Sequence, residues 1–183
     1  MNELIYYSIV KTALRVNYHQ WAEGFVNSYS SKLDDARRYD IKNLCMAEIC
    51  FSKAQNSGTG KTELYNKTLE YLAKFKSQEF YSICRIFNLV IMIYYETYEL
   101  EYLYYQCDSY QHYLKDHIDQ IPDEDYQSNI NFIHYCFNLT KLKQIADGQT
   151  LKKLETTVKN ETLCTNYHWV IKKVEDLVKN ILE

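Results

Sequence analysis

Proline and glycine are scarce in this sequence. It contains a single proline, Pro122, and only four glycines among 183 residues. These two residue types mark the tight turns that join neighbouring strands, so their scarcity argues against a fold of many strands. Hydrophobic residues make up 46% of the chain and charged residues 25%. This composition is typical of a soluble globular protein with a substantial core.

The sequence also lacks a hydrophobic run long enough to cross a membrane. Its most apolar stretch, Ile86–Tyr95, is bounded by Arg85 and Glu96. As a helix it would rise about 15 Å, half of a bilayer core, so we expect a buried helix instead. The first residues, Met1–Leu4, carry no basic segment and do not open a signal peptide. We therefore expect a cytoplasmic protein without a membrane partner.

A surplus of basic residues is missing as well. The formal net charge is −3, whereas a nucleic-acid-binding surface needs positive charge to neutralise phosphates. We therefore expect no nucleic-acid partner.

Cysteine pairs with motif spacing are absent, although the chain has six cysteines. None forms a C-x-x-C pair, and the chain is too long and too hydrophobic for a small disulfide scaffold. Most lie within apolar periodic runs, where cysteine behaves as a small hydrophobic residue. We expect reduced, mostly buried thiols at Cys45, Cys50, Cys84, Cys107, Cys136 and Cys164.

Apolar residues recur at spacings of three and four along almost the whole chain. This spacing places them on one face of a helix, which must pack against a partner. We predict about nine helices with short connections. Buried faces are expected at Ile5, Ile9, Ala13 and Val16; at Trp21, Phe25, Tyr29 and Leu33; at Phe80, Ile83, Phe87, Ile91 and Tyr94; and at Leu100, Leu103, Cys107, Tyr110 and Leu114.

Acidic residues, and interruptions of the apolar spacing, occur where these helices should begin and end. Asp34 or Asp35 can cap one helix, because a short carboxylate accepts its free N–H groups. Pro122 followed by the acids 123–125 predicts another helix start. We interpret both acidic clusters as caps, not as acid–base pairs. The helix that begins at Pro122 should end at Asp147-Gly148.

Two segments resemble tetratricopeptide repeats. Asn66–Leu72 resembles the start of the second helix of such a repeat, and Leu100–Tyr105 resembles the same element one repeat later. Thr68 and Tyr102 then align at a spacing of 34, the period of this repeat. Trp21–Val26 resembles the same helix in an earlier unit.

This resemblance implies an all-α fold in which antiparallel helical hairpins stack as a right-handed solenoid. The whole chain also resembles the carboxy-terminal part of a group of uncharacterised bacterial tetratricopeptide proteins, which implies no known activity. We expect residues 1–183 to form a single helical-repeat domain, which could be part of a longer protein.

One stretch, Gln55–Thr62, resembles a phosphate-binding loop because it ends in Gly-Lys-Thr. That motif requires glycine at its first position and a buried strand before it, whereas Cys45–Ala54 has a helical pattern. We interpret the stretch as a loop between helices, with Thr59 or Thr62 as the cap of the next one. A nucleotide-dependent enzyme that uses Gly58–Lys61 is the alternative.

No other motif points to chemistry. The histidines show neither H-E-x-x-H nor zinc-finger spacing, and the cysteines lie within helical segments. We therefore expect no catalytic, cofactor-binding or metal-binding residues. The five histidines are His19, His112, His117, His134 and His168.

Tyrosine is unusually frequent, with 19 residues. Six of them crowd positions 94–105, and consecutive residues on a helix cannot all face one core. Tyr94 continues a buried face, whereas Tyr102 and Tyr105 lie away from the buried face of their helix. Tyrosine is common at interfaces because it offers a large ring with a polar tip. The alternative is that the rings fill the core of degenerate repeats.

Together these observations predict a non-enzymatic module that binds a protein or peptide, with Tyr102 and Tyr105 as candidate partner-binding residues. A purely structural or dimerisation domain, including a homodimer, is an alternative.

Overall fold

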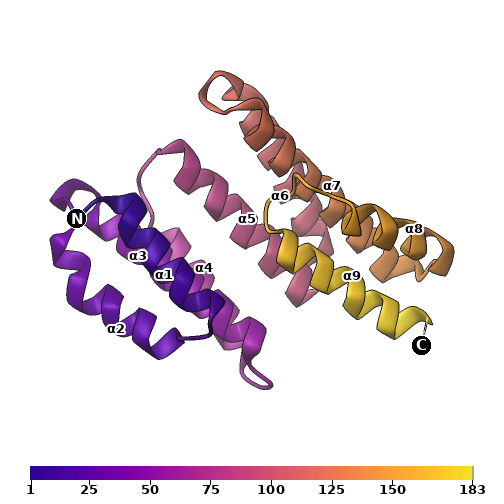
Figure 1. Cartoon of the computed structure of the whole chain (residues 1–183), viewed down its shortest axis with the longest axis horizontal. Coiled ribbons are helices and arrows are strands. Elements are labelled where there is room, and N and C mark those ends of the chain that lie inside the picture. The colour runs from indigo at the N-terminus through magenta and orange to yellow at the C-terminus, as the bar shows by residue number, and fades with distance from the viewer. Residues whose placement is uncertain (183) are drawn as a thin grey trace. The chain divides into compact units, whose positions relative to one another are not determined.

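The chain is helical throughout the part that the structure describes. The computed structural model describes residues 1–182, and helices account for 83% of the chain. Nine α-helices and no strands occur within these residues, which confirms the all-α prediction and the number of helices (Figure 1). The helices are α1 (Glu3–Arg15), α2 (His19–Tyr29), α3 (Asp35–Asn56), α4 (Lys61–Ala73), α5 (Phe80–Thr97), α6 (Leu100–Asp116), α7 (Asp123–Ile145), α8 (Gly148–Lys159) and α9 (Tyr167–Leu182).

Two short 3-10 helices lie between α2 and α3 and between α6 and α7: Ser30–Lys32 and Ile118–Gln120. None of the described helices has the length and apolar character required to span a bilayer. The chain divides into two compact units, Met1–Ile93 and Tyr94–Glu183, and the boundary between them along the chain falls within α5.

Helix α3 is the centre of the first unit. It contacts α1, α2 and α4, and buried residues lie on several sides of the helix. The carboxylate of Asp34 accepts the N–H of Ala36 at 2.9 Å, which confirms one of the two predicted caps. Within α1, α2 and α3, the residues with no exposed surface are Tyr6, Val10, Ala22, Val26, Leu44, Cys45, Ala47, Ile49 and Ala54.

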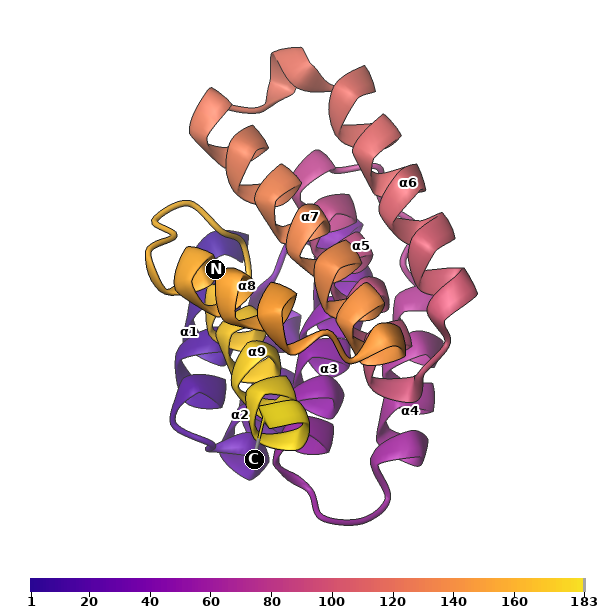
Figure 2. The ribbon, with the colours of Figure 1, turned by 90° about the vertical axis from the view of Figure 1, so that its right-hand side faces the viewer.

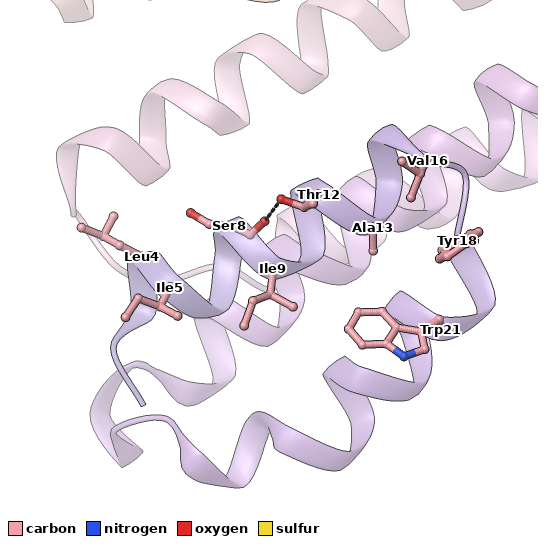
Figure 3. A pocket seen from close by; sticks show the side chains of 9 residues that line it. All are labelled: Leu4, Ile5, Ser8, Ile9, Thr12, Ala13, Val16, Tyr18 and Trp21. Carbon is pink, nitrogen blue, oxygen red and sulfur yellow. Dashed lines mark hydrogen bonds between the residues drawn. The ribbon is translucent and has the colours of Figure 1, made fainter.

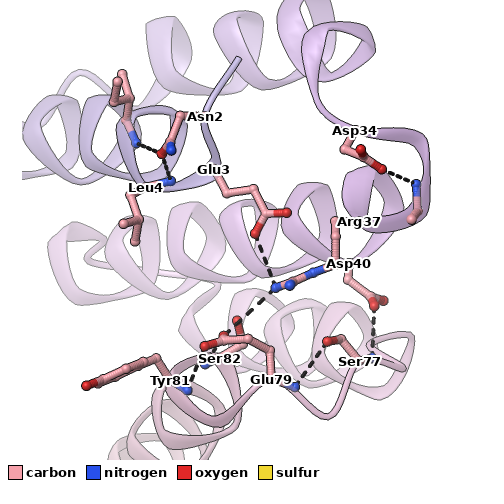
Figure 4. Close-up of polar contacts among 12 residues, drawn as sticks. Asn2, Glu3, Leu4, Asp34, Arg37, Asp40, Ser77, Glu79, Tyr81 and Ser82 are labelled. Carbon is pink, nitrogen blue, oxygen red and sulfur yellow. Dashed lines mark hydrogen bonds and ion pairs between the residues drawn. The ribbon is translucent and has the colours of Figure 1, made fainter.

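A polar network ties the loop before α5 to α1 and α3 (Figure 4). The carboxylate of Asp40, buried on α3, accepts the backbone N–H groups of Lys76 and Ser77 at 3.0 and 2.9 Å. Arg37 lies between two carboxylates, at 3.2 Å from Glu3 and 3.9 Å from Glu79. These contacts fix the first turn of α1 against the amino-terminal end of α3.

The second unit is organised around α6, α7 and α9. Helix α7 contacts α6, α8 and α9, and Figure 2 shows α6 and α7 side by side. The hydroxyl of the buried Tyr110 donates to Asn129 of α7 at 2.8 Å. All five residues of the predicted face of α6 are buried, which confirms that prediction: Leu100, Leu103, Cys107, Tyr110 and Leu114.

The end of α7 and the starts of α8 and α4 differ from the predicted ones in the residues that cap them. Helix α7 ends with Ala146 in the left-handed region, at φ 53°. Asp147 does not end α7 but caps α8, because it accepts the N–H groups of Gln149 and Thr150. Helix α4 is preceded by Gly60 at φ 70°, with no side-chain cap. The prediction of a threonine cap there was wrong. Gly60 occupies the capping position, because its left-handed conformation carries no steric cost for glycine.

Candidate functional site

Helix α1 is apolar on two faces, and only one of them is buried. Tyr6, Val10 and Leu14 face the core. Leu4 is 66% exposed, and Val16 is exposed as well. The prediction that Ile5, Ile9, Ala13 and Val16 form the buried face was therefore wrong, since only Ala13 among them is buried.

Helix α2 repeats this arrangement. Ala22 and Val26 are its buried residues. Trp21 is 54% exposed, and Tyr29 is also exposed. The prediction of a buried Trp21–Phe25–Tyr29 face was wrong for Trp21 and Tyr29, because Ala22 and Val26 make the contact with the core. The Phe25 ring is half-buried and lies 5.0 Å from the ring of the buried Tyr6. Only Leu33, the last residue of that predicted face, is buried.

The three aromatic rings at positions 21, 25 and 29 of α2 form a ladder. The Trp21 and Phe25 rings stack with centroids 5.4 Å apart, and the Phe25 and Tyr29 rings stack at 5.1 Å. A spacing of four residues puts successive side chains on the same face of a helix. The ladder therefore runs along one side of α2. It is held by stacking between its rings and by the contact of Phe25 with Tyr6.

A tight turn brings the two exposed faces together. Asn17 has φ 61°, a conformation that asparagine tolerates better than most residues. The N–H of Tyr18 donates to the carbonyl of Ala13 at 2.9 Å. The turn places Val16, Tyr18 and Trp21 at one end of the space between the helices.

The result is an open groove of about 700 Å³ on the outer side of α1 and α2 (Figure 3). The side chains of Ile5 and Ile9 point from α1 toward the side of α2, where Trp21 lies. The hydroxyl of Thr12 donates to the carbonyl of Ser8 at 2.8 Å. The groove is lined by Leu4, Ile5, Ser8, Ile9, Thr12, Ala13, Val16, Tyr18 and Trp21.

Charged side chains are excluded from the lining of the groove. None of its nine lining residues is charged. Three charged residues of α1 and α2 instead form ion pairs with α3: Glu3 with Arg37 at 3.2 Å, Lys11 with Glu48 at 2.9 Å and Glu23 with Lys53 at 2.5 Å. The outer surface is thus left apolar, which is the character of the centre of a protein interface.

A buried polar cluster anchors the inner side of α1. The Tyr7 hydroxyl donates to Glu48, which also pairs with Lys11. The guanidinium of Arg85 lies 4.1 Å from the centroid of the Tyr7 ring. Burial, together with the nearby Glu48 carboxylate, raises the pKa of Tyr7 well above its ordinary value. The phenol stays protonated and keeps donating, so the cluster holds α1 with its second apolar face outward.

The predicted partner-binding residues lie in the second unit, on α6. Tyr102 is 61% exposed and Tyr105 is 71% exposed. The Tyr102 ring lies 5.7 Å from that of Tyr94, whereas Tyr105 has the more open position. Tyr104, between them, is half-buried and stacks on Phe137 at 5.5 Å.

Tyr95, and not Tyr94, is the buried tyrosine of α5. Tyr95 is 3% exposed and packs edge-on against Trp169 at 5.3 Å, whereas Tyr94 is half-exposed. The ammonium of Lys143 lies 4.2 Å above the Tyr95 ring and donates to the carbonyl of Tyr95 at 2.9 Å. The prediction of a buried Tyr94 was wrong because α5 presents its next residue, about 100° further round, to α7 and α9.

The loop of residues 57–60, which contains Gly58 and Gly60, connects α3 and α4. It follows the last turn of α3 and leads directly into α4, as predicted. A phosphate-binding loop follows a strand, and residues 1–182 contain none. Within the loop, the Ser57 hydroxyl donates to the carbonyl of Thr59. Gly58–Lys61 therefore lacks the strand that orients such a loop toward phosphate.

The other candidate groups are dispersed. Across the described residues, no three His, Cys, Asp or Glu side chains are grouped so that they could hold a metal ion. His19 contacts Ser52 at 2.9 Å, and His117 contacts the carbonyl of Tyr113 at 2.8 Å. All six cysteines lie in the described part of the chain, and none is joined in a disulfide bond. Five are buried, as predicted, and Cys164 is half-buried.

No protein-family model matches this chain, and no curated protein or solved structure matches it either.

Proposed function

We propose that this chain is a non-enzymatic protein–protein interaction module, and that the groove on α1 and α2 receives an apolar helical surface of its partner. The observation that carries this proposal is an exposed apolar surface on two adjacent helices, held open by rigid packing beneath it. Large exposed apolar patches with a polar surround mark interaction sites in soluble proteins. Apolar helices dock into such grooves through side chains spaced three and four apart.

The helix contacts are in keeping with a tetratricopeptide-like arrangement within each unit. Consecutive helices pack in pairs, as in α1–α2, α3–α4, α6–α7 and α8–α9. Contacts also join alternate helices, α1 to α3 and α7 to α9. Stacked antiparallel hairpins would produce both kinds of contact, and such arrays bind partners through extended surfaces. We propose this architecture together with the function, by analogy at the level of the fold.

A selection of displayed helical peptides tests the proposed function. Peptides selected against the immobilised chain should carry apolar residues at helical spacing. Their binding should shift the fluorescence of Trp21, which is the exposed tryptophan, since Trp169 is buried. Trp21→Phe identifies the source of the signal.

The variant that tests whether peptides bind in the groove is Thr12→Lys, which places a charge there at an exposed helical position. It should abolish peptide binding, whereas Thr62→Lys, at an exposed position of α4, should leave it unchanged. Equal peptide binding by the wild type, Thr12→Lys and Thr62→Lys would contradict the proposal, as would the absence of enriched apolar helical peptides on a monomeric chain.

The surface of Tyr102 and Tyr105 is a second place where a partner could bind. Exposed tyrosines are frequent energetic centres of interfaces. Peptides that lose binding on Tyr105→Ala but not on Thr12→Lys would identify that surface as the binding site.

A further inference from the structure

We propose that the partner received by the groove is a second copy of this chain, in a two-fold symmetric dimer formed by α1 and α2 of each copy. This inference rests on the proposed function, because it assigns the partner of the same groove. Four observations point to a second copy: the pattern of side chains on α1, the satisfied hydroxyl of Thr12, the absence of charge and the extent of the exposed surface.

The outer face of α1 has a pattern that is complementary to itself. Leu4, Ser8, Thr12 and Val16 are all exposed and follow one another at intervals of four, so they form one ridge of the helix. Their sizes read large, small, small, large in either direction along the chain. Two copies of α1 that cross with opposite directions can therefore place Ser8 of one beside Thr12 of the other.

In that register the two-fold axis passes between Ser8 and Thr12. The small residues allow the helices to approach closely, and Leu4 of one copy meets Val16 of the other. Packing of such four-residue ridges corresponds to a crossing angle near −50°. A two-fold interface requires the same patch on both copies, and this ridge provides one.

Thr12, one of the two polar residues at the axis, can be buried without losing a hydrogen bond. The Thr12 hydroxyl already donates to the carbonyl of Ser8 within α1. A hydroxyl that is paired within its own helix does not need water, so covering it carries little of the usual cost of burying a polar group.

The lack of charge favours a copy of the same surface over a charged partner. A two-fold interface brings each group close to its own equivalent, so a charged patch would repel itself. Here the lining carries no charge. Glu3, Lys11 and Glu23 are already paired with α3. Arg15, exposed at the end of α1, lies outside the lining. Self-association therefore meets no such repulsion within the lining, and nothing in the lining selects a partner by charge.

The exposed area also fits a second hairpin better than a single peptide helix. Six large apolar side chains on and beside the groove are 48% to 66% exposed: Leu4, Ile5, Val16, Tyr18, Trp21 and Tyr29. At roughly 150–250 Å² for each aromatic side chain and somewhat less for each aliphatic one, they expose on the order of 600 Å². This area is close to the ~800 Å² per partner of a standard interface. A helix seated in the groove would leave Tyr29 uncovered, whereas a second α1–α2 hairpin can cover both helices.

A pair of charge variants tests this dimer. The first carries Ser8→Lys with Thr12→Lys, and the second carries Ser8→Glu with Thr12→Glu. Both positions are exposed, and lysine and glutamate favour helix more than serine and threonine do, so both variants should fold. Circular dichroism verifies this. Sedimentation equilibrium of the whole chain then measures mass against concentration.

The wild type should approach twice the 22.0 kDa of one chain as its concentration rises. Each charge variant should dissociate about 100-fold or more readily, because like charges meet at the axis. An equimolar mixture of the two variants should recover the dimer, because lysines then face glutamates. The matched control places the same charges at Thr62 and Asn66, two exposed residues of α4 at the same spacing, and should dimerise like the wild type.

Three results would overturn the dimer: a wild type that remains monomeric at about 1 mM, dimers that persist in both charge variants, or folded variants whose mixture does not associate. Peptide selection separates this inference from the proposed function. A monomeric chain that still binds helical peptides through the groove would refute the homodimer and leave the interaction module standing. A chain that neither dimerises nor selects peptides would refute both.

Discussion

Neighbouring tyrosines in this chain occupy opposite environments. Tyr95 is enclosed by Trp169 and by the ammonium of Lys143, whereas Tyr94 is half-exposed. Tyr105 extends toward solvent from α6. The frequency of tyrosine therefore has no single explanation, because some rings fill the core and others remain outside it.

This contrast predicts different effects of truncation. Tyr95→Ala should lower the free energy of unfolding by about 3 kcal/mol or more, as for other buried aromatic residues. Tyr105→Ala should lower it by less than about 1 kcal/mol, as for surface substitutions. Urea denaturation followed by circular dichroism measures both. A large and equal loss in the two variants would mean that Tyr105 is packed.

The cysteines should react slowly and in a fixed order. Burial raises the pKa of the Cys107 thiol to about 12, and burial with the Glu161 carboxylate nearby raises that of Cys164 to about 12. Only the thiolate is nucleophilic, so near neutral pH the reactive fraction is small and grows about tenfold with each pH unit.

With a disulfide reagent at about pH 8, Cys164 should react first, because it is the half-buried one. Cys164→Ser should remove this first phase, and all six thiols should react in denaturant. Rapid labelling of several thiols in the native protein would contradict the burial of the other five cysteines.

At the scale of elements, the loop between α3 and α4 shows how a motif depends on its surroundings. Gly58–Lys61 has the residues of a degenerate phosphate-binding loop, but it follows a helix. Its one left-handed residue, Gly60, makes the turn into α4. The short connection is therefore sufficient to explain the glycine without a ligand.

We predict that ATP and GTP do not raise the melting temperature, because a ligand that does not bind the native state cannot stabilise it. Lys61→Ala, on the exposed first residue of α4, should behave like the wild type in the same thermal-shift measurement. A saturable rise of several degrees that Lys61→Ala abolishes would establish the nucleotide-dependent enzyme instead.

For the molecule as a whole, the ion pairs of the first unit separate charge from the apolar groove. The charged residues of α1 and α2 that pair with α3 leave the proposed dimer interface to apolar contacts. Interactions between exposed charges weaken strongly with salt, whereas apolar burial does not depend on such screening.

The dissociation constant of the dimer should therefore change by less than about twofold between roughly 0.05 and 0.5 M sodium chloride. Sedimentation in the two buffers measures it. The mixed dimer of the lysine and glutamate variants is the internal control, because its charge pairing should weaken as salt rises. A wild-type dimer that weakens in parallel with the mixed one would show that charge holds it together.

The sequence by itself determined the helices and much of the core. Scarce proline and glycine, and apolar spacings of three and four, predict an all-α fold of about nine helices. The buried face of α6 was also predictable, because its apolar residues keep that spacing along a single face. Capping at Asp34 followed from the local chemistry of a carboxylate beside free N–H groups.

Only the tertiary structure decided which side of α1 and α2 would be buried. Both helices carry large apolar residues on more than one face, so periodicity cannot tell the face that packs on α3 from the face that remains exposed. The choice was made by long-range contacts, including those of Tyr7 and Lys11 with Glu48. Local spacing contains no information about such partners. The apolar groove could therefore not be seen in the sequence, where spacing predicted that five of its lining residues lie in the core: Ile5, Ile9, Ala13, Val16 and Trp21.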